Sequence, residues 1–167
     1  MNARDLGFPQ EDPTHELALA DDAATRALGR ALAALVRPGE VLGLVGTLGA
    51  GKTTLMQGMI GALDLGDASS PTYTLINLHE PDDPGAPRLA HIDLYRLETY
   101  DDLESIGYWD VAGDPDTITC VEWLNRIPEA WPDWGRARTT GTLVCLDRAE
   151  GGRIARVWCD PARPLTL

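Results

Sequence analysis

Hydrophobic residues recur along this chain in two patterns, which together predict strands that alternate with helices. Short apolar runs are typical of strands buried in a sheet, and they occur at residues 16–19, 41–45, 89–94, 117–121, 143–146 and 153–159. Apolar side chains at helical spacing predict two amphipathic helices. The first is capped by Asp21 or Asp22 and ends near Val36, and the second begins near Gly51.

Turn residues between the apolar runs predict two antiparallel hairpins. Residues 72–80 partly alternate between apolar and polar and indicate a strand. A turn rich in Asp, Pro and Gly at 81–87 joins this strand to the one at 89–94. Residues 150–152, which read EGG, connect the last two strands in the same way.

A glycine-rich run directly after the strand at 41–45 is the strongest chemical signal in the sequence. Residues 46–53 read GTLGAGKT and match GxxxxGK[ST], the P-loop whose backbone N–H groups cradle phosphates while its lysine reaches the β- and γ-phosphates. Lys52 is the only lysine among the 14 basic residues, and a planar guanidinium would not replace its compact ammonium there. Strand, loop and helix follow in the required order, which a chance glycine-rich turn does not explain. The predicted nucleotide-binding residues are Gly46, Leu48, Gly49, Ala50, Gly51, Lys52, Thr53 and Thr54.

These elements predict an α/β protein with a three-layer, P-loop NTPase-like fold, in which helices flank a mainly parallel sheet with antiparallel hairpins. Residues 98–105 add a short acidic helix, and residues 128–134 add a loop rich in Pro and Trp. No linker or repeat divides the chain. We expect a flexible N-terminal tail at residues 1–14 and one P-loop ATPase domain at residues 15–167.

Hydrolysis of a bound triphosphate would need a carboxylate that helps Thr53 to hold magnesium. Ligands in an open α/β sheet meet the carboxyl ends of the parallel strands. Two acids have that position, because Asp93 follows the apolar run at 89–92 and Glu122 follows the run at 118–121. We predict that both are catalytic and that Thr53, Asp93 and Glu122 hold the metal. A surface salt bridge or a cap is the alternative role for each acid.

Composition and charge restrict the classes of function. The formal net charge is −12 and the sequence pI is about 4.5, so we expect no direct tight binding to DNA or RNA, whereas a basic protein partner is compatible. No segment approaches the roughly eighteen consecutive apolar residues of a transmembrane helix. The three cysteines lie in apolar runs without CxxC spacing, which indicates buried free thiols in a reducing cytoplasm.

Histidines and tryptophans carry weaker signals. His91 lies inside an apolar strand, where a packed and hydrogen-bonded histidine is a better interpretation than a metal ligand. The five tryptophans fall late in the chain and predict core or interface packing rather than stacking on nucleotides.

Four blocks of sequence give the chain a resemblance to a known family. They are LGAGKTT at 48–54, SPTYTL at 70–75, HIDLYRL at 91–97 and VEW at 121–123. In this order and spacing they resemble the TsaE (YjeE) family of bacterial P-loop ATPases, which are needed for the threonylcarbamoyladenosine (t6A) modification of tRNA. The resemblance covers about residues 15–160, and it departs at Thr47, where the family usually has an acidic residue.

The resemblance implies a role for each matching residue of the phosphate and metal site. Lys52 would hold the β- and γ-phosphates, Thr53 would bind magnesium, and Thr54 would bind a phosphate oxygen. Asp93 resembles a Walker-B-type carboxylate, and Glu122 resembles a magnesium ligand or water-orienting group. Which of the two acids touches the ion is left open.

The resemblance also implies a partner and further contacts. The chain would be an ATPase that acts on a TsaB–TsaD-like complex, meets tRNA only indirectly, lies in the cytoplasm and is a monomer when isolated. Residues 70–72 resemble a switch-like segment near the γ-phosphate, and the rim around Asp22 and the last hairpin is a candidate contact for the base. Arg96 could act as an arginine finger, with a salt bridge at the strand end as its alternative.

A small-molecule or nucleotide kinase is the main alternative function. It would need an acceptor pocket and usually an arginine-bearing lid, whereas the arginines here are dispersed and no lid-like insertion follows the P-loop helix. A GTPase would need an NKxD run, and the only lysine already lies in the P-loop. A non-catalytic ATP-binding module would not need Asp93 and Glu122.

Overall fold

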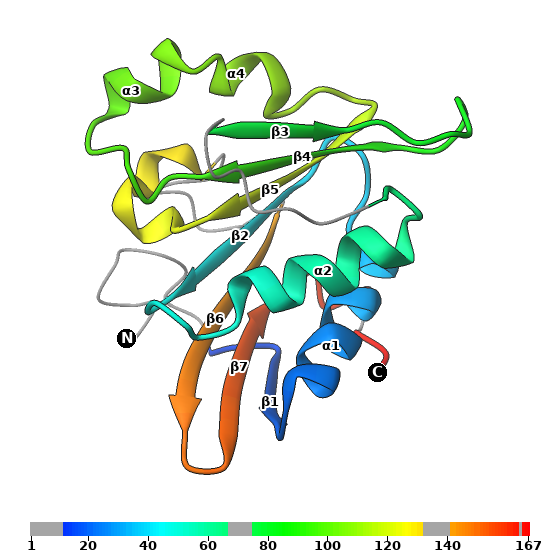
Figure 1. The fold of residues 1–167 in the computed structure, drawn as a ribbon, viewed down its shortest axis with the longest axis vertical. Helices are drawn as coiled ribbons and strands as arrows, with labels where there is room; N and C mark the ends of the chain where they lie inside the picture. Colours follow the sequence, from blue (N-terminus) through cyan, green and yellow to red (C-terminus); the bar gives the residue numbers. More distant parts are fainter. Residues whose placement is uncertain (1–11, 67–74, 132–140, 164) are drawn as a thin grey trace.

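A computed structural model describes residues 12–66, 75–131, 141–163 and 165–167 of the chain. Its strands form one seven-stranded sheet in the order β1-β7-β6-β2-β5-β4-β3 (Figure 1). The strands are β1 (His15–Leu19), β2 (Val41–Gly46), β3 (Ile76–His79), β4 (Arg88–Asp93), β5 (Thr117–Glu122), β6 (Thr142–Ala149) and β7 (Gly152–Trp158). The helices are α1 (Asp22–Leu35), α2 (Lys52–Ala62), α3 (Tyr100–Ser105) and α4 (Tyr108–Val111), with 3-10 turns η2 (Leu124–Arg126) and η3 (Pro128–Ala130).

Parallel strands form the centre of the sheet, and antiparallel strands complete both edges. Strands β6, β2, β5 and β4 run parallel to one another. Beyond β6, strands β7 and β1 are added antiparallel, and β3 is added antiparallel beyond β4. The predicted parallel sheet with antiparallel hairpins is therefore confirmed. The arrowheads of β2, β4 and β5 point to the same side in Figure 1, where their carboxyl ends meet.

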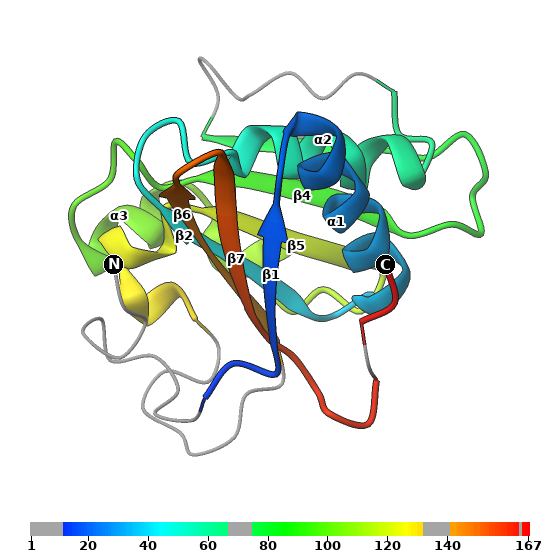
Figure 2. The same cartoon turned by 90° about the horizontal axis from the view of Figure 1, so that it is seen from below.

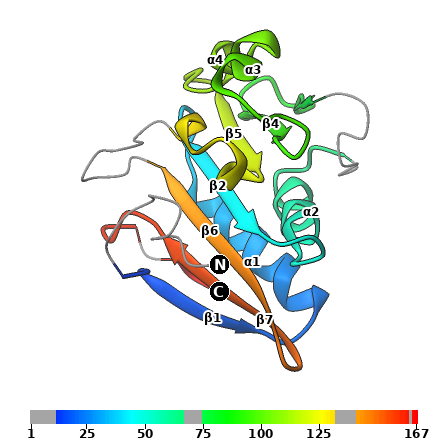
Figure 3. The same ribbon diagram turned by 90° about the vertical axis from the view of Figure 1, so that its left-hand side faces the viewer.

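Helices cover both faces of the sheet, which gives the predicted three layers. Helices α1 and α2 lie together on one face (Figure 2), over a core that includes Leu28, Leu32 and Met56. Elements α3, α4, η2 and η3 contribute to a second core, which includes Leu103 and Tyr108, and η2 lies across β2 from α2 (Figure 3). Both faces of the central strands are covered, and every residue of β2 and β5 is buried. This burial explains why these strands are apolar runs rather than alternating patterns.

Two glycines bring α1 and α2 into backbone contact. A Cβ atom at Gly29 would lie 2.1 Å from the carbonyl oxygen of Leu55 in α2, and one at Gly58 would lie 2.2 Å from a backbone oxygen of α1. Any side chain at either position would force the helices apart, because the atoms it would meet belong to the backbone. This contact fixes α1 against the helix that follows the P-loop.

Element bounds agree with the sequence patterns in most places. Asp21 is the N-cap of α1, and its carboxylate accepts a hydrogen bond from the Ala24 amide at 2.8 Å. The described part of the strand predicted at 72–80 is strand β3, since residues 72–74 lie outside the described residues. The three cysteines are free and buried, as predicted. No helix in the described part of the chain is long and apolar enough to cross a membrane.

The structure corrects two local predictions. The acidic helix predicted at 98–105 begins only at Tyr100, because Thr99 and Asp102 form a capping box there, and the four-residue helix α4 follows it. The loop predicted at 128–134 contains the 3-10 turn η3, which starts at Pro128, while residues 132–134 lie outside the described ones. Helix α4 and the turn η3 are each too short to leave a periodic apolar pattern, so their sequences resemble loops.

Candidate functional site

The P-loop connects the buried strand β2 to helix α2 through a turn that requires glycine. Gly49 and Gly51 have φ angles of 73° and 106°, in the left-handed region that favours glycine. Gly51 is also the N-cap of α2 and has no side chain to cap the first turn. The amides at this helix N-terminus therefore have no capping side chain to accept from them, and such a terminus attracts anions.

Lys52 lies in the loop with its ammonium folded back on the backbone. Its Nζ donates hydrogen bonds to the carbonyl oxygens of Gly46 at 2.8 Å and Thr47 at 3.1 Å. The same Nζ lies 3.6 Å from the centroid of the Trp123 ring, which is a cation–π contact. Burial lowers the pKa of Lys52, and the nearby Glu122 and Asp93 carboxylates partly oppose that shift. Lys52 is thus the main positive charge facing the carboxylates.

The two predicted carboxylates lie side by side at the ends of parallel strands. Asp93 of β4 is the register partner of Glu122 of β5, as the strand-end argument predicted. Asp93 is half-buried, and its Oδ1 accepts a hydrogen bond from the Tyr95 amide at 2.9 Å. Burial is the largest influence on the pKa of Asp93 and raises it, and the neighbouring Glu122 charge raises it further, although the Tyr95 amide acts in the opposite direction.

His91 holds Glu122 in a buried hydrogen bond. Its Nε2 donates to Glu122 Oε1 at 2.9 Å, and the two side chains are only 1% and 4% exposed. The Nδ1 atom of His91 is buried and has no hydrogen-bond partner among the described residues, so Nε2 is the ring nitrogen that meets Glu122. Glu122 therefore has one oxygen bound to His91 and one left for the site. This confirms the prediction that His91 is a hydrogen-bonded core residue.

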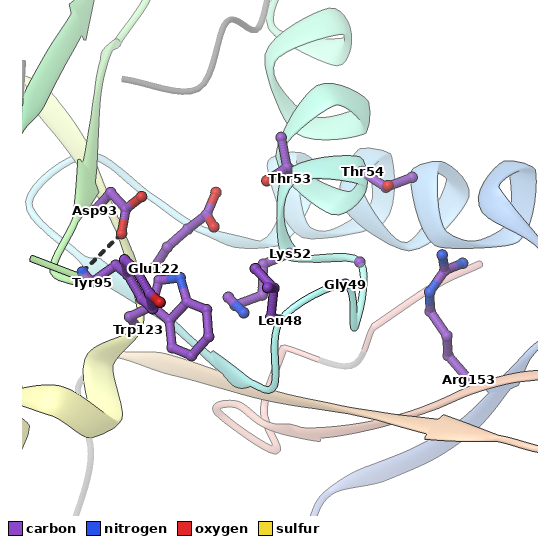
Figure 4. Close-up of a pocket in the computed structure, with 11 residues that line it drawn as sticks. Leu48, Gly49, Lys52, Thr53, Thr54, Asp93, Tyr95, Glu122, Trp123 and Arg153 are labelled. Carbon is purple, nitrogen blue, oxygen red and sulfur yellow. Dashed lines mark hydrogen bonds between the residues drawn. The ribbon is translucent and has the colours of Figure 1, made fainter. Parts of the chain in front are cut away.

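These groups surround one pocket of about 420 Å³ (Figure 4), a volume within the range of small-molecule sites. Eight of the residues predicted from the sequence line it: Leu48, Gly49, Gly51, Lys52, Thr53, Thr54, Asp93 and Glu122. Gly46 and Ala50 do not line it. Instead, a Cβ at Gly46 would meet the Leu146 carbonyl oxygen at 2.5 Å, and Ala50 is completely buried.

The pocket also contains Tyr95, Trp123 and Arg153, none of which was named as a site residue, although Arg153 belongs to the last hairpin that was a candidate contact for the base. Tyr95 and Trp123 directly follow the ends of β4 and β5, so the strand-end rule could have identified them. Their rings contact each other with centroids 4.9 Å apart, and Trp123 has a left-handed backbone with φ of 60°. Core or interface packing, the prediction for the tryptophans, holds for the buried Trp131 and Trp158, while Trp123 packs partly against the same core and also lines the pocket.

The predictions for Arg96 and for residues 70–72 have other outcomes. Arg96 is exposed, does not line the pocket and makes no salt bridge with another described residue, so the alternative of a strand-end salt bridge is wrong for the described part of the chain. The switch-like segment at 70–72 lies outside the described residues.

The oxygen atoms in the pocket suit a magnesium ion that is shared with a ligand. Within the described ranges, no group of three or more His, Cys, Asp and Glu side chains could hold a metal by itself. Magnesium is usually held by one or two carboxylates together with phosphate oxygens and water rather than by a cage of protein ligands. The Thr53 hydroxyl and the Asp93 and Glu122 carboxylates form such a partial set of hard oxygen donors.

Comparison with known proteins identifies the family. The family described as "Threonylcarbamoyl adenosine biosynthesis protein TsaE" matches residues 19–150, which is most of the chain. The chain belongs to the TsaE family. All pocket-lining residues except Arg153 fall within the matched region.

Relatives of this TsaE-family chain come from several bacterial groups and carry the name "tRNA threonylcarbamoyladenosine biosynthesis protein TsaE". The Streptomyces coelicolor protein is 39% identical over 129 residues, which cover 75% of this chain and 80% of that protein. The Synechocystis protein is 40% identical over 117 residues, covering 68% and 73%. The Mycobacterium tuberculosis protein is 39% identical over 110 residues, and the match spans 66% of its length and 63% of this chain.

A solved structure supports the fold. The crystal structure of Bacillus subtilis YdiB superposes with a TM-score of 0.64 at 26% sequence identity, and the match covers 89% of this chain and 88% of that one. The TsaE family and the P-loop fold together indicate a nucleotide-binding protein.

Proposed function

We propose that this TsaE-family chain is the ATP-binding and ATP-hydrolysing subunit required for t6A modification of tRNA, and that it acts on a TsaB–TsaD-like complex. The observation that carries the proposal is the placement of Lys52 in a P-loop opposite Asp93 and Glu122 in one pocket. The family name supports the pathway. The acidic body, with a net charge of −12, favours docking on proteins and only indirect contact with tRNA.

Residues of the pocket divide the work between binding and hydrolysis. The loop amides and Lys52 would bind the phosphates, and the Lys52 ammonium would exchange its Gly46 and Thr47 carbonyl partners for phosphate oxygens. Thr53, Asp93 and Glu122 would hold magnesium, which would supply positive charge to the phosphate groups.

Glu122 has a further role in the proposal. Because His91 occupies Oε1, the remaining carboxylate oxygen is the one that can orient a water molecule or hold the metal. A carboxylate fixed in this way loses little orientation freedom when the reaction begins, which is how positioned groups accelerate phosphoryl transfer.

The charges in the pocket favour slow hydrolysis by the isolated protein. Among the described residues that line it, Lys52 and Arg153 are the only cations. Arg153 lies at the end of the pocket away from the carboxylates and is paired with Asp22 (Figure 4). Charge that develops on the γ-phosphate would thus lack an arginine, and an arginine supplied by a partner accelerates such reactions about 10³-fold or more.

Steady-state phosphate release with and without the cognate TsaB–TsaD-like complex, at matched salt, tests the proposal. We expect slow turnover alone, an acceleration of about 10-fold or more by the complex, and no turnover in a Lys52→Ala variant that also loses ATP binding by calorimetry. Fast hydrolysis that is indifferent to the complex would instead indicate a self-contained ATPase. Transfer of the γ-phosphate to an added small molecule would indicate a kinase.

A further inference from the structure

Three neighbours engage the ammonium group of Lys52. An ammonium has three N–H donors, and the carbonyl oxygens of Gly46 and Thr47 accept hydrogen bonds from Nζ at 2.8 and 3.1 Å. The Trp123 ring is the third neighbour, with its centroid 3.6 Å from Nζ, and the ammonium points toward that ring in Figure 4. Because Lys52 is only 4% exposed, a phosphate oxygen can reach Nζ only if one of these contacts is given up.

Phosphate binding and the Trp123 ring make opposing demands on Lys52. In the proposed function, on which this inference rests, the ammonium donates to phosphate oxygens. Such a charge-assisted bond brings the oxygen to about 2.8 Å from Nζ, whereas the ring already covers one side of the same atom. Either the ammonium turns away from the ring or the ring moves aside. The cation–π attraction is lost in both cases.

Trp123 is fixed against Lys52 by its own backbone and by a second ring. It follows the last residue of β5, and its backbone is left-handed with φ of 60° and ψ of 33°, which is rare for a bulky residue. The Tyr95 ring packs on it with centroids 4.9 Å apart, and the Arg126 guanidinium lies 5.9 Å from the centroid of Tyr95. Backbone strain of this kind persists only where the surroundings hold it, so the ring is placed over Lys52 by the fold.

The position of Trp123 does not suit the usual task of a tryptophan beside a nucleotide, which is to stack on a base. Its ring lies at the end of the pocket that holds Asp93 and Glu122 (Figure 4). These carboxylates would act with magnesium at the phosphates, so the base lies away from them. The neighbour that the ring can influence is therefore the phosphate-binding lysine.

We infer that Trp123 is a positioning residue, which holds the Lys52 ammonium against the P-loop carbonyl groups and competes with the phosphates for it. Any ligand that takes the ammonium must offset the lost contact with the ring. The ring thus lowers the affinity of the pocket for ATP and for the ADP that hydrolysis leaves, and it favours release of the product.

Calorimetry with Mg·ATP and with Mg·tripolyphosphate, which lacks the nucleoside, measures this competition in the full chain. Trp123→Leu removes the ring but keeps a Cβ atom, so the cost of the left-handed backbone is retained. We expect this variant to bind both ligands about fivefold more tightly than the parent, because the lost contact concerns only the phosphates. Trp123→Phe keeps a weaker aromatic face and should tighten each ligand about twofold.

Trp109 provides the matched control, since it is a 40% exposed tryptophan that also packs on tyrosine rings but does not line the pocket. Trp109→Leu should bind both ligands like the parent, and circular dichroism should show each variant folded. Unchanged or weaker binding of the two ligands by Trp123→Leu would overturn the inference. Equal gains in Trp123→Leu and Trp123→Phe would also overturn it, because the ring would then only block space. A parent protein that binds neither ligand would overturn the proposed function itself.

Discussion

Replacement of His91 by phenylalanine tests whether Glu122 must be held in place for hydrolysis. The substitution keeps the ring volume in the core but removes the Nε2 donor that lies 2.9 Å from Glu122 Oε1. A hydrogen bond to a charged group contributes about 1.5–3 kcal/mol, and here the acceptor is only 4% exposed, so water cannot easily replace the donor. We therefore expect the free energy of unfolding to fall by about 2 kcal/mol.

The catalytic effect should be larger than the effect on binding. Glu122 would be free to rotate, and a misplacement of about 1 Å in a reacting group can cost roughly 100-fold in rate. Because the P-loop does not depend on His91, the KM for ATP should stay within about threefold of the parent value while kcat falls about 10- to 100-fold. Steady-state hydrolysis together with urea denaturation measures both quantities. His91→Gln, which retains an N–H donor, should recover part of the loss in kcat.

His79 offers a matched control because it is a buried histidine on the neighbouring strand β3 that makes no bond to a described carboxylate. His79→Phe should change stability without a selective effect on kcat. If His91→Phe hydrolyses ATP at the parental rate despite lower stability, His91 is only a packing residue. The same holds if the two variants lose kcat equally.

Three further predictions concern the carboxylates, the helix contact and a buried thiol. Asp93→Asn and Glu122→Gln should each keep the fold and cut steady-state ATP hydrolysis by about 100-fold or more, and parental rates in both would place the metal elsewhere. Gly29→Ala should lower the free energy of unfolding by about 2–3 kcal/mol in urea denaturation, because the new Cβ would lie 2.1 Å from a backbone oxygen. Gly61→Ala is the control and should be neutral or stabilising, because no described atom lies within 4 Å of its Cβ position. Burial raises the pKa of the Cys145 thiol from 9.0 to about 12, so the thiol loses its proton at a higher pH in the folded state than in the unfolded state. The free energy of unfolding, measured by denaturation, should therefore fall as pH rises from 9 to 12. A Cys145→Ala variant that shows the same fall would contradict this cause.

Local sequence was sufficient to predict the half of the pocket that the P-loop forms. The strand, glycines, lysine and helix of a P-loop are contiguous, so the residues near Lys52 are placed by their own backbone. Asp93 and Glu122 are distant in sequence, but both end apolar runs, and parallel strands bring such ends together. The contiguous motif was enough to place the residues near Lys52, and the strand-end rule was enough to place Asp93 and Glu122.

Residues that depend on long-range packing could not be predicted in the same way. Arg153 reaches the P-loop because an antiparallel hairpin returns β7 alongside β1, and no local sequence pattern singles this arginine out from the others in the hairpin. The bond between His91 and Glu122 depends on which face of β4 and β5 each side chain takes, and the apolar runs hide that choice because both faces are buried. Trp123 was predicted to serve core or interface packing, as large aromatic residues usually do, and its additional place in the pocket lining was not foreseen.

The burial of Lys52 has a consequence for covalent regulation. It is the only lysine in the sequence, and it is 4% exposed. Enzymes that acetylate, methylate or ubiquitinate lysine side chains would therefore find no accessible acceptor on the folded protein. The single ε-amino group lies inside the P-loop, so acetylation there would remove the positive charge that we propose binds the phosphates.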